Sequence, residues 1–288
     1  MILVSLVAIL ALIRLPDNSL HVIACDVGQG DAVLVTYKTS EILIDGGPNG
    51  NVLDCLDRHL PFWDRRLEVV IMTHPQTDHY TGLIDVFKNY KVGVFVAGGL
   101  DSSNQSYQVL KTLVRGSGTR VVNPTTGMKV IVSLIQLDIV WPNKTFVNDE
   151  VAYISPKNAG NVLGTYTTKL DPNEFSIVAI MSFQGFRGIF TGDIDPETEE
   201  RIIAENVLKS VNYIKIPHHG SKNGLTENFL RILNPSVAVI SVGHKNSYGH
   251  PNREILDMLT KYKVKTYRTD IMGDVEIVYD GEILSKVN

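Results

Sequence analysis

The chain alternates between short apolar runs rich in β-branched residues and brief clusters of Gly, Pro, Asn or Asp. This pattern is typical of short strands separated by turns. It predicts strands at 21–25, 32–37, 41–44, 67–72, 92–97, 119–122, 128–132, 137–141, 176–183, 188–191, 211–216, 237–242, 264–267, 275–279 and 282–285. Apolar residues at helical spacing predict helices at 52–59, 83–90, 106–115, 196–209, 226–233 and 252–262. Strands mixed with helices in this way favour an α/β (α+β) fold, with two mixed β-sheets packed face to face and helices outside.

Residues 1–15 and 143–171 depart from this pattern. The first stretch is apolar almost throughout up to Arg14, but it is shorter than the roughly 20 residues of a membrane-spanning helix. It also lacks the basic start and the cleavage site of a signal peptide. A signal-anchor stub, a truncated membrane segment and a covered strand all remain open, and we expect membrane association of some kind. We therefore separate an N-terminal segment, 1–18, from one domain, 19–288, and expect residues 143–171 to form a surface insertion.

Composition and charge narrow the class of protein. A hydrophobic fraction of 44% with 20% charged residues is that of a globular chain. The net charge of −4 argues against a uniformly basic coat for nucleic acid, yet residues 209–268 carry +7 and the rest carries −11. A polyanionic partner near this segment is allowed, and an ordinary solvated surface is the alternative. Cys25 and Cys55 lack C-x-x-C spacing, so we expect Cys25 to be a small buried hydrophobe and expect no disulfide framework.

The strand predicted at 67–72 runs directly into a loop that contains His74, Asp78 and His79. Folds of this class place their chemistry at the carboxyl ends of strands. Imidazole and carboxylate stay deprotonated near neutral pH and suit zinc or manganese. The loop therefore indicates a metal site, with two solvated histidines as the alternative.

Three further strands are followed by groups of the same kind. Asp193 comes after the strand at 188–191, and Asp195 fits the N-cap of the next helix better, which leaves Asp193 free. His218 and His219 follow the strand at 211–216, and neighbours in an extended segment point apart, so at most one of them faces a site. His250 lies in a polar turn after the strand at 237–242, where it either contacts substrate or is inert.

Six motifs follow one another along the chain: Asp26–Ala32, Ile44–Gly47, His74–His79, Thr191–Asp193, Pro217–Ser221 and Tyr248–Pro251. Taken in order, they resemble the metallo-β-lactamase superfamily, and within it the hydrolase domain of ComEC-type DNA-internalisation competence proteins. The resemblance implies an αββα sandwich with a metal site at one edge between the sheets. It also implies hydrolysis, usually of a phosphodiester, in a domain that follows membrane-spanning segments and is thought to degrade one DNA strand. A membrane-associated or extracytoplasmic location would fit, with the cytoplasm left open.

Transferred residue by residue, the resemblance implies two unequal metal sites. The loop of the family has the form H-x-H-x-D-H, and Gln76 stands where its second histidine belongs. One site would be complete, whereas the other would keep His74 and the shared Asp193, with amide oxygens of Gln76 or Asn173 in reserve. Since such oxygens are weak zinc ligands, we expect one firmly bound divalent ion, zinc or manganese, and a second that is loose or absent. The complete site would contain Asp78, His79, Asp193 and His219.

The hydrolytic hypothesis assigns further roles. Asp78 would hold the ion and orient the attacking water. Four side chains are candidates to neutralise charge on the phosphate: Lys215, Lys222, His218 and His250. Four motif residues are expected near the site in structural roles: Asp26, Gln29, Asp31 and Asp45.

Two alternatives keep the fold but change the function. Related domains cleave phosphorylcholine, other phosphoesters or lactones, so DNA and a small ester are both candidate substrates. A degenerate domain that only binds DNA is the non-enzymatic alternative, because Gln76 replaces a histidine. Salt dependence distinguishes DNA from a small ester as the substrate, since binding of DNA weakens steeply with salt. Metal analysis tests whether the domain has lost its catalytic site.

Overall fold

The computed structural model describes residues 16–154 and 162–287. The membrane association expected for residues 1–15 lies outside these described residues. Within the described part of the chain, no helix is long and apolar enough to cross a membrane.

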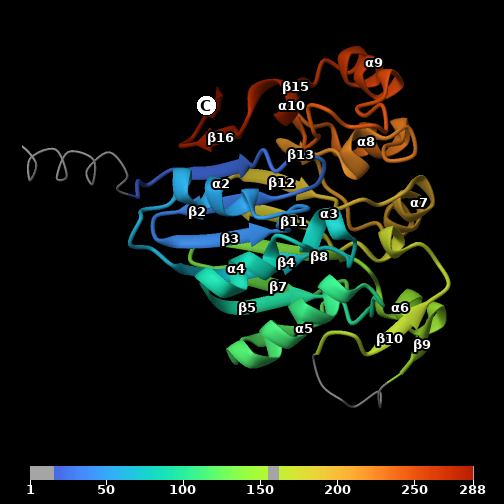
Figure 1. The fold of residues 1–288 in the computed structure, drawn as a ribbon. Coiled ribbons are helices and arrows are strands. Elements are labelled where there is room, and N and C mark those ends of the chain that lie inside the picture. Colours follow the sequence, from blue (N-terminus) through green and yellow to red (C-terminus); the bar gives the residue numbers. More distant parts are fainter. Residues whose placement is uncertain (1–15, 155–161, 288) are drawn as a thin grey trace, which may run out of the picture.

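Two large sheets form the centre of the molecule (Figure 1). The first has the strand order β17-β16-β1-β2-β3-β4-β5-β6, the second has the order β15-β14-β13-β12-β11-β8-β7, and β9 pairs with β10 apart from both. Each large sheet mixes parallel and antiparallel pairs. The strands are β1 Leu20–Ala24, β2 Val33–Tyr37, β3 Ser40–Ile44, β4 Arg66–Met72, β5 Lys91–Ala97, β6 Arg120–Val122, β7 Lys129–Val132, β8 Ile135–Trp141, β9 Val151–Tyr153, β10 Tyr166–Thr168, β11 Val178–Phe183, β12 Phe186–Phe190, β13 Tyr213–Lys215, β14 Val237–Ile240, β15 Lys265–Arg268, β16 Val275–Tyr279 and β17 Ile283–Val287.

Helices cover the outer face of each sheet, as the sequence predicts. The helix α2, with α4 and α5, packs on the first sheet, and α6 to α9 pack on the second. The α-helices are α2 Asn51–His59, α3 Thr77–Tyr80, α4 Leu83–Asn89, α5 Gln105–Ser117, α6 Lys144–Glu150, α7 Pro196–Ala204, α8 Glu227–Leu233, α9 Arg253–Lys261 and α10 Thr269–Met272, and the 3-10 turns are η1 Pro172–Phe175 and η2 Pro217–Gly220.

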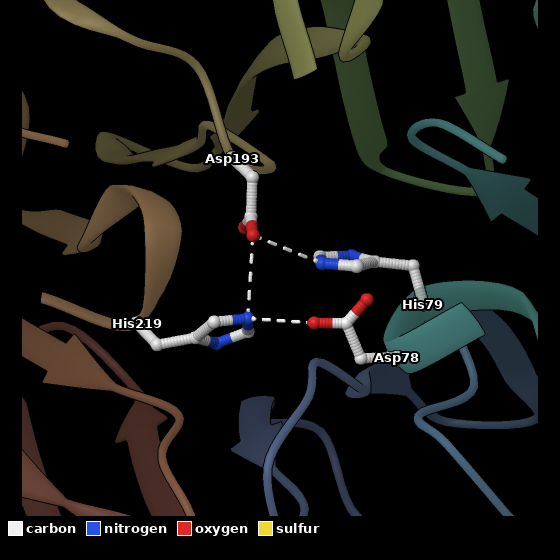
Figure 2. Close-up of side chains that lie close together, drawn as sticks. All are labelled: Asp78, His79, Asp193 and His219. Carbon is white, nitrogen blue, oxygen red and sulfur yellow. Dashed lines mark hydrogen bonds and ion pairs between the residues drawn. The ribbon is translucent and has the colours of Figure 1, made fainter. Parts of the chain in front are cut away.

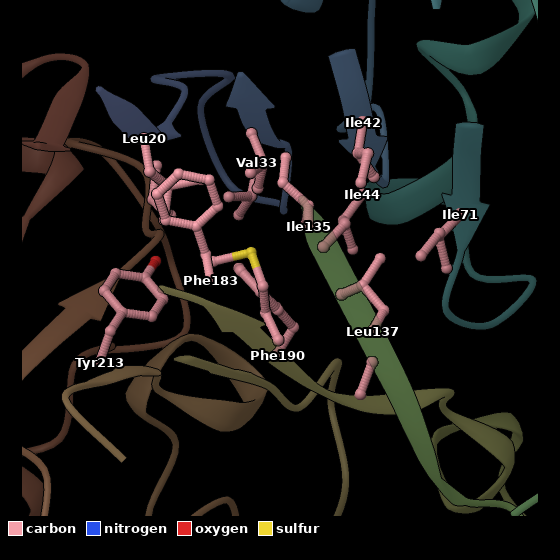
Figure 3. Packing of buried hydrophobic residues seen from close by; sticks show 14 of the residues in the cluster. Leu20, Val33, Ile42, Ile44, Ile71, Ile135, Leu137, Phe183, Phe190 and Tyr213 are labelled. Carbon is pink, nitrogen blue, oxygen red and sulfur yellow. The ribbon is translucent and has the colours of Figure 1, made fainter. Parts of the chain in front are cut away.

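The main core lies between the two sheets (Figure 3). Successive residues of a strand point to opposite faces, so Val22 and Ala24 of β1 enter this core while Ile23 packs under the helices. Phe183 and Phe190 reach into the same core from the second sheet. Strands buried on both faces explain the near-continuous apolar runs of the sequence.

A disulfide joins Cys25 to Cys55, so the expectation of a free, buried Cys25 was wrong. Cys25 follows β1 and Cys55 lies on the buried face of α2, with the two Cα atoms 5.8 Å apart. The residues are 30 positions apart in sequence, and spacing alone does not reveal such a pairing. The packing of α2 on the first sheet brings them together.

Some boundaries differ from those predicted. The helix expected at 196–209 ends at Ala204, close to Asn206, which has a left-handed backbone with φ 54°. Asp195 caps this helix by accepting from Thr198 N over 2.8 Å, as the sequence indicates. The expected insertion at 143–171 is partly ordered, since it contains α6, β9 and β10. The helices α3 and α10 were missed because four residues are too few for a helical period.

Loops from both sheets meet at one edge, on the side of α3 and α7 in Figure 1. Strands β4, β12, β13 and β14 all end there, and so does β1 before its glycine-rich loop. Hydrogen bonds join these loops across the sheets, from Ile177 N to Thr73 O and from Gly243 N to Oε1 of Gln29. This edge is therefore where the predicted motifs are assembled.

Candidate metal centre

The loop after β4 turns at once into α3, which carries Asp78 and His79. Two other loops hold this turn, since Asp31 N donates to Asp78 O over 3.1 Å and Gly46 N donates to His79 O over 2.7 Å. Gly30 is required at this contact, because a β-carbon there would lie 2.3 Å from the carbonyl oxygen of Asp78. The glycine-rich loops after β1 and β3 thus form the wall against which the histidine loop is placed.

Four ligand-type side chains converge from three loops (Figure 2). One ligand atom from each of Asp78, His79, Asp193 and His219 lies within 4.8 Å of the others. Oδ2 of Asp193 is 3.2 Å from Nε2 of His79 and of His219, and Nε2 of His219 is 3.3 Å from Oδ2 of Asp78. Three of these side chains are buried, whereas that of Asp78 is 30% exposed at the rim.

The far nitrogen of each of the two histidines is fixed by a hydrogen bond that points away from the cluster. Nδ1 of His79 donates to Oδ2 of Asp45 over 2.8 Å, and Thr73 donates to both oxygens of that carboxylate. Nδ1 of His219 donates to the carbonyl oxygen of Ser241 over 3.0 Å. Because the proton is held at Nδ1, Nε2 of each ring presents a lone pair to the cluster.

This donor set fits a divalent metal ion. Nε2 of His79 is buried without a hydrogen-bond partner although it lies 3.2 Å from Asp193, and Nε2 of His74 is buried and unpaired as well. Unpaired buried nitrogens cost free energy unless a ligand takes up their lone pairs. Two imidazoles and two carboxylates are ligands that zinc and manganese accept.

A family model described as the metallo-beta-lactamase superfamily matches residues 25–244. The chain belongs to the metallo-β-lactamase superfamily. It is similar to ComE operon protein 3 of Bacillus subtilis (25% identical, covering 90% of this chain and 33% of that protein) and to Recombination protein 2 of Haemophilus influenzae (26%, covering 88% and 28%). Competence protein ComA of Neisseria gonorrhoeae is 24% identical, covering 91% and 32%. The chain spans about a third of the length of these curated relatives.

Solved structures agree on the fold. CmlA, a diiron beta-hydroxylase from Streptomyces venezuelae, superposes with a TM-score of 0.53 at 14% identity, covering 92% of this chain and 54% of that one. The metallo-beta-lactamase fold protein YhfI of Bacillus subtilis gives a TM-score of 0.50 at 10% identity, covering 86% and 95%. The predicted superfamily and the αββα fold are confirmed, and so is the predicted resemblance to competence-type proteins. This fold binds one or two metal ions.

In this metallo-β-lactamase domain the position of Lys215 does not fit its expected role, which was to neutralise charge on the phosphate. Its ammonium is buried, forms an ion pair with Asp31, lies 3.4 Å from Oδ1 of Asp193 and donates to Gly192 O over 3.1 Å. A group enclosed in this way does not reach a phosphate at the mouth of the site. Lys215 instead holds one oxygen of Asp193, which leaves Oδ2 facing the two histidines.

Charges around the cluster shift the pKa values of its groups. Burial alone would lower the pKa of His79 and of His219, but Asp193 and its neighbouring carboxylates raise both well above the ordinary value. Burial alone would raise the pKa of Asp78, but the two histidines hold it well below its usual range. Once both rings have given up their Nε2 protons to bind an ion, the buried carboxylates outnumber the one remaining buried cation, the ammonium of Lys215, and this excess of negative charge stabilises a bound metal ion.

The second metal site of the superfamily is only partly built here. Gln76 is half-buried, and its Nε2 donates over 3.2 Å to Oδ1 of Asp171, which is not one of the four clustered residues. Burial and the nearby His79 lower the pKa of His74 to about 3, so this ring is neutral. Oδ1 of Asn173 is buried without a partner, which leaves it available as a further oxygen ligand.

The other predicted residues lie around the cluster. His218 and His219 have φ values of 49° and 53°, so the segment is not extended as assumed, yet only His219 enters the cluster. The ring of His218 faces His250, with centroids 5.9 Å apart. Gln29 joins the glycine-rich loop to Gly243, as a structural role requires. Asp26 is exposed and accepts from Gly28 N, away from the cluster.

Two residues that hold the histidines were missed by sequence reasoning. Thr73 binds the carboxylate of Asp45, and Ser241 acts through its backbone carbonyl. A carbonyl belongs to every residue, so no sequence signal marks Ser241. Thr73 directly precedes His74 at the end of a predicted strand, and this position is the only sequence feature that could have identified it as a residue of the site.

Proposed function

We propose that this domain is a metal-dependent phosphodiesterase that hydrolyses DNA. The observation that carries the proposal is the convergence of Asp78, His79, Asp193 and His219 within 4.8 Å at a strand edge. Proteins of this fold are generally hydrolytic, and two relatives are named for competence and for recombination, processes that act on DNA.

An ion held by these ligands would act as a Lewis acid and would bring the pKa of a bound water to about 7. Asp78 is the ligand that is open to solvent, so its carboxylate orients the attacking water at the rim. Asp45 and the Ser241 carbonyl keep the histidine protons at Nδ1, and both rings remain ligands through Nε2. Lys215 keeps the carboxylate of Asp193 in place from the interior.

Groups around the cluster would bind the phosphate. His218 is half-buried beside His219, and His250 lies beyond it. Burial and the two neighbouring histidines lower the pKa of His250, so it acts as a neutral donor. Lys222 is exposed in the loop after η2 and adds a positive charge. Such donors stabilise negative charge that develops on the phosphate oxygens.

Charge favours DNA over a small ester as the substrate. Residues 209–268 carry +7 in a chain of net charge −4, and they contain His219 and both loops at the mouth. Lys215 is buried and paired with Asp31, but the other positive charges of this segment would attract a polyanion more strongly than a singly charged ester.

Cleavage assays with Mn²⁺ or Zn²⁺ at increasing NaCl test this proposal. We expect DNA to be cut, with kcat/KM falling steeply as salt rises, whereas hydrolysis of bis(p-nitrophenyl) phosphate changes little. Cleavage of the small ester without cleavage of DNA would contradict the choice of substrate. No metal-stimulated cleavage of either substrate would contradict the hydrolase itself.

A further inference from the structure

A row of aromatic rings leads from the cluster to the protein surface. His218 lies beside His219 with ring centroids 6.2 Å apart, and His250 lies 5.9 Å from His218. Tyr248 stacks on His250 at 5.7 Å with an interplanar angle of 25°. The row ends in solvent, because Tyr248 is 70% exposed.

The loop that carries Tyr248 is held by its own hydrogen bonds. Nδ2 of Asn246 donates to His250 O over 2.8 Å, and His250 N donates back to Oδ1 of Asn246 over 3.0 Å. Pro251 is buried against Gly220, where a β-carbon would lie 2.7 Å from the proline Cβ. Tyr248 is thus displayed by a supported loop that is packed against the loop of His219.

The surroundings of the ring suit a nucleic acid. Lys245 lies in the same loop and Lys222 in the loop after η2, and both are exposed. Neither lysine has a carboxylate partner within the part of the chain that the structure describes. Nδ1 of His250 is enclosed and has no hydrogen-bond partner there either. A large exposed ring together with exposed, unpaired lysines in its own loop and in the loop after η2 suits the binding of single strands, in which bases stack on aromatic side chains.

We propose that Tyr248 is a stacking platform for an unpaired base of single-stranded DNA, whose backbone then passes His250 and His218 to the cluster. The inference rests on the proposed function and adds the class of substrate. A duplex keeps its bases stacked inside, so only a single strand offers a free base to the ring. Stacking tolerates any base, and the site therefore selects strand form rather than sequence.

Binding of two oligomers with the same charge tests the role of the ring. Fluorescence anisotropy compares oligo-dT with an abasic oligomer of equal length on the metal-loaded full chain, over a time in which gels show both strands to stay intact. We expect the wild type to prefer oligo-dT by about 10-fold, from one stacked base. Tyr248→Phe should keep this preference, and Tyr248→Ala should bring the ratio close to one.

Phe62→Ala is the matched control, because Phe62 is an aromatic residue of similar exposure, 63%, in the loop before β4. It should leave the preference for oligo-dT unchanged. A wild type without that preference, or Tyr248→Ala with the full preference, would overturn the stacking proposal and leave the nuclease proposal standing. Failure of the wild type to bind either oligomer would instead contradict DNA as the substrate.

Discussion

Nδ1 of His79 lies 2.8 Å from Oδ2 of Asp45 in the buried floor of the metal centre, while Nε2 of the same ring faces Asp193. Asp45 comes from the loop after β3 and His79 from the short helix α3 that follows β4; β3 and β4 are parallel neighbours in the first sheet. The pair sets the tautomer of the ring, so it decides which nitrogen is offered to a metal ion.

Asp45→Asn is expected to weaken metal binding by about 10- to 100-fold, because the amide no longer orients the imidazole by its charge. Asparagine tolerates the left-handed backbone at this position, where φ is 60°, so the fold should persist. Competition with a chelator measures the affinity. Asp26→Asn, at an exposed motif residue away from the cluster, should bind metal as the wild type does. Equal affinity in Asp45→Asn would contradict the positioning role.

Gln76→His should raise the metal content from one ion towards two per chain. The present amide donates to Asp171, whereas an imidazole would add a ligand beside the neutral His74 and the unpartnered Asn173 oxygen. Elemental analysis after dialysis gives the stoichiometry, with Gln76→Asn as the control that adds no imidazole. A variant that still binds one ion would show that Gln76 is not what makes the two sites unequal.

The pattern of apolar and polar residues was sufficient to predict the layers of the fold and the segments that carry the ligands, because each ligand follows the end of a strand. The pattern did not reveal that the side chain of Lys215 points into the protein interior rather than towards a substrate. All three residues of β13 are buried, so this strand lacks the polar and apolar alternation that would have indicated the direction. The partner of Cys25 was equally hidden, because α2 brings Cys55 to it from 30 residues away. Both errors concern tertiary packing, which local patterns do not encode.

Loss of the disulfide should destabilise the domain. Its two cysteines are 30 positions apart in sequence, and closing such a loop in the unfolded chain is worth about 3–4 kcal/mol. The double variant Cys25→Ala, Cys55→Ala should therefore unfold at lower denaturant than the oxidised wild type. Reductant should shift the wild type to lower denaturant and leave the variant unchanged. A wild type whose unfolding midpoint does not change with reductant would contradict this expectation.

Stability should depend on the ionisation of Glu199. Its carboxyl is buried, with Oε2 accepting from Thr226 N over 2.8 Å and Oε1 unpaired, and burial raises its pKa to about 8. The folded state binds the proton more tightly than the unfolded state does. The stability that protonation contributes is therefore present below 4.5, the ordinary pKa of a glutamate in an unfolded chain, and is lost as the pH rises towards 8.

Glu199→Gln does not ionise, so it should be more stable than the wild type at pH 8 by roughly 1–3 kcal/mol and should differ little at pH 4.5. Denaturant unfolding at the two pH values measures the difference. A difference that is the same at both values would show that the ionisation of this carboxyl does not matter.

The central claim is that Asp193 holds the ion with which this domain cuts DNA, since its Oδ2 lies 3.2 Å from Nε2 of both histidines. The most direct measurement is the rate of DNA cleavage by metal-loaded wild type and by Asp193→Ala, under identical Mn²⁺ or Zn²⁺. We expect cleavage by the wild type and a loss of at least about 100-fold in the variant. Undiminished cleavage by Asp193→Ala would contradict the claim.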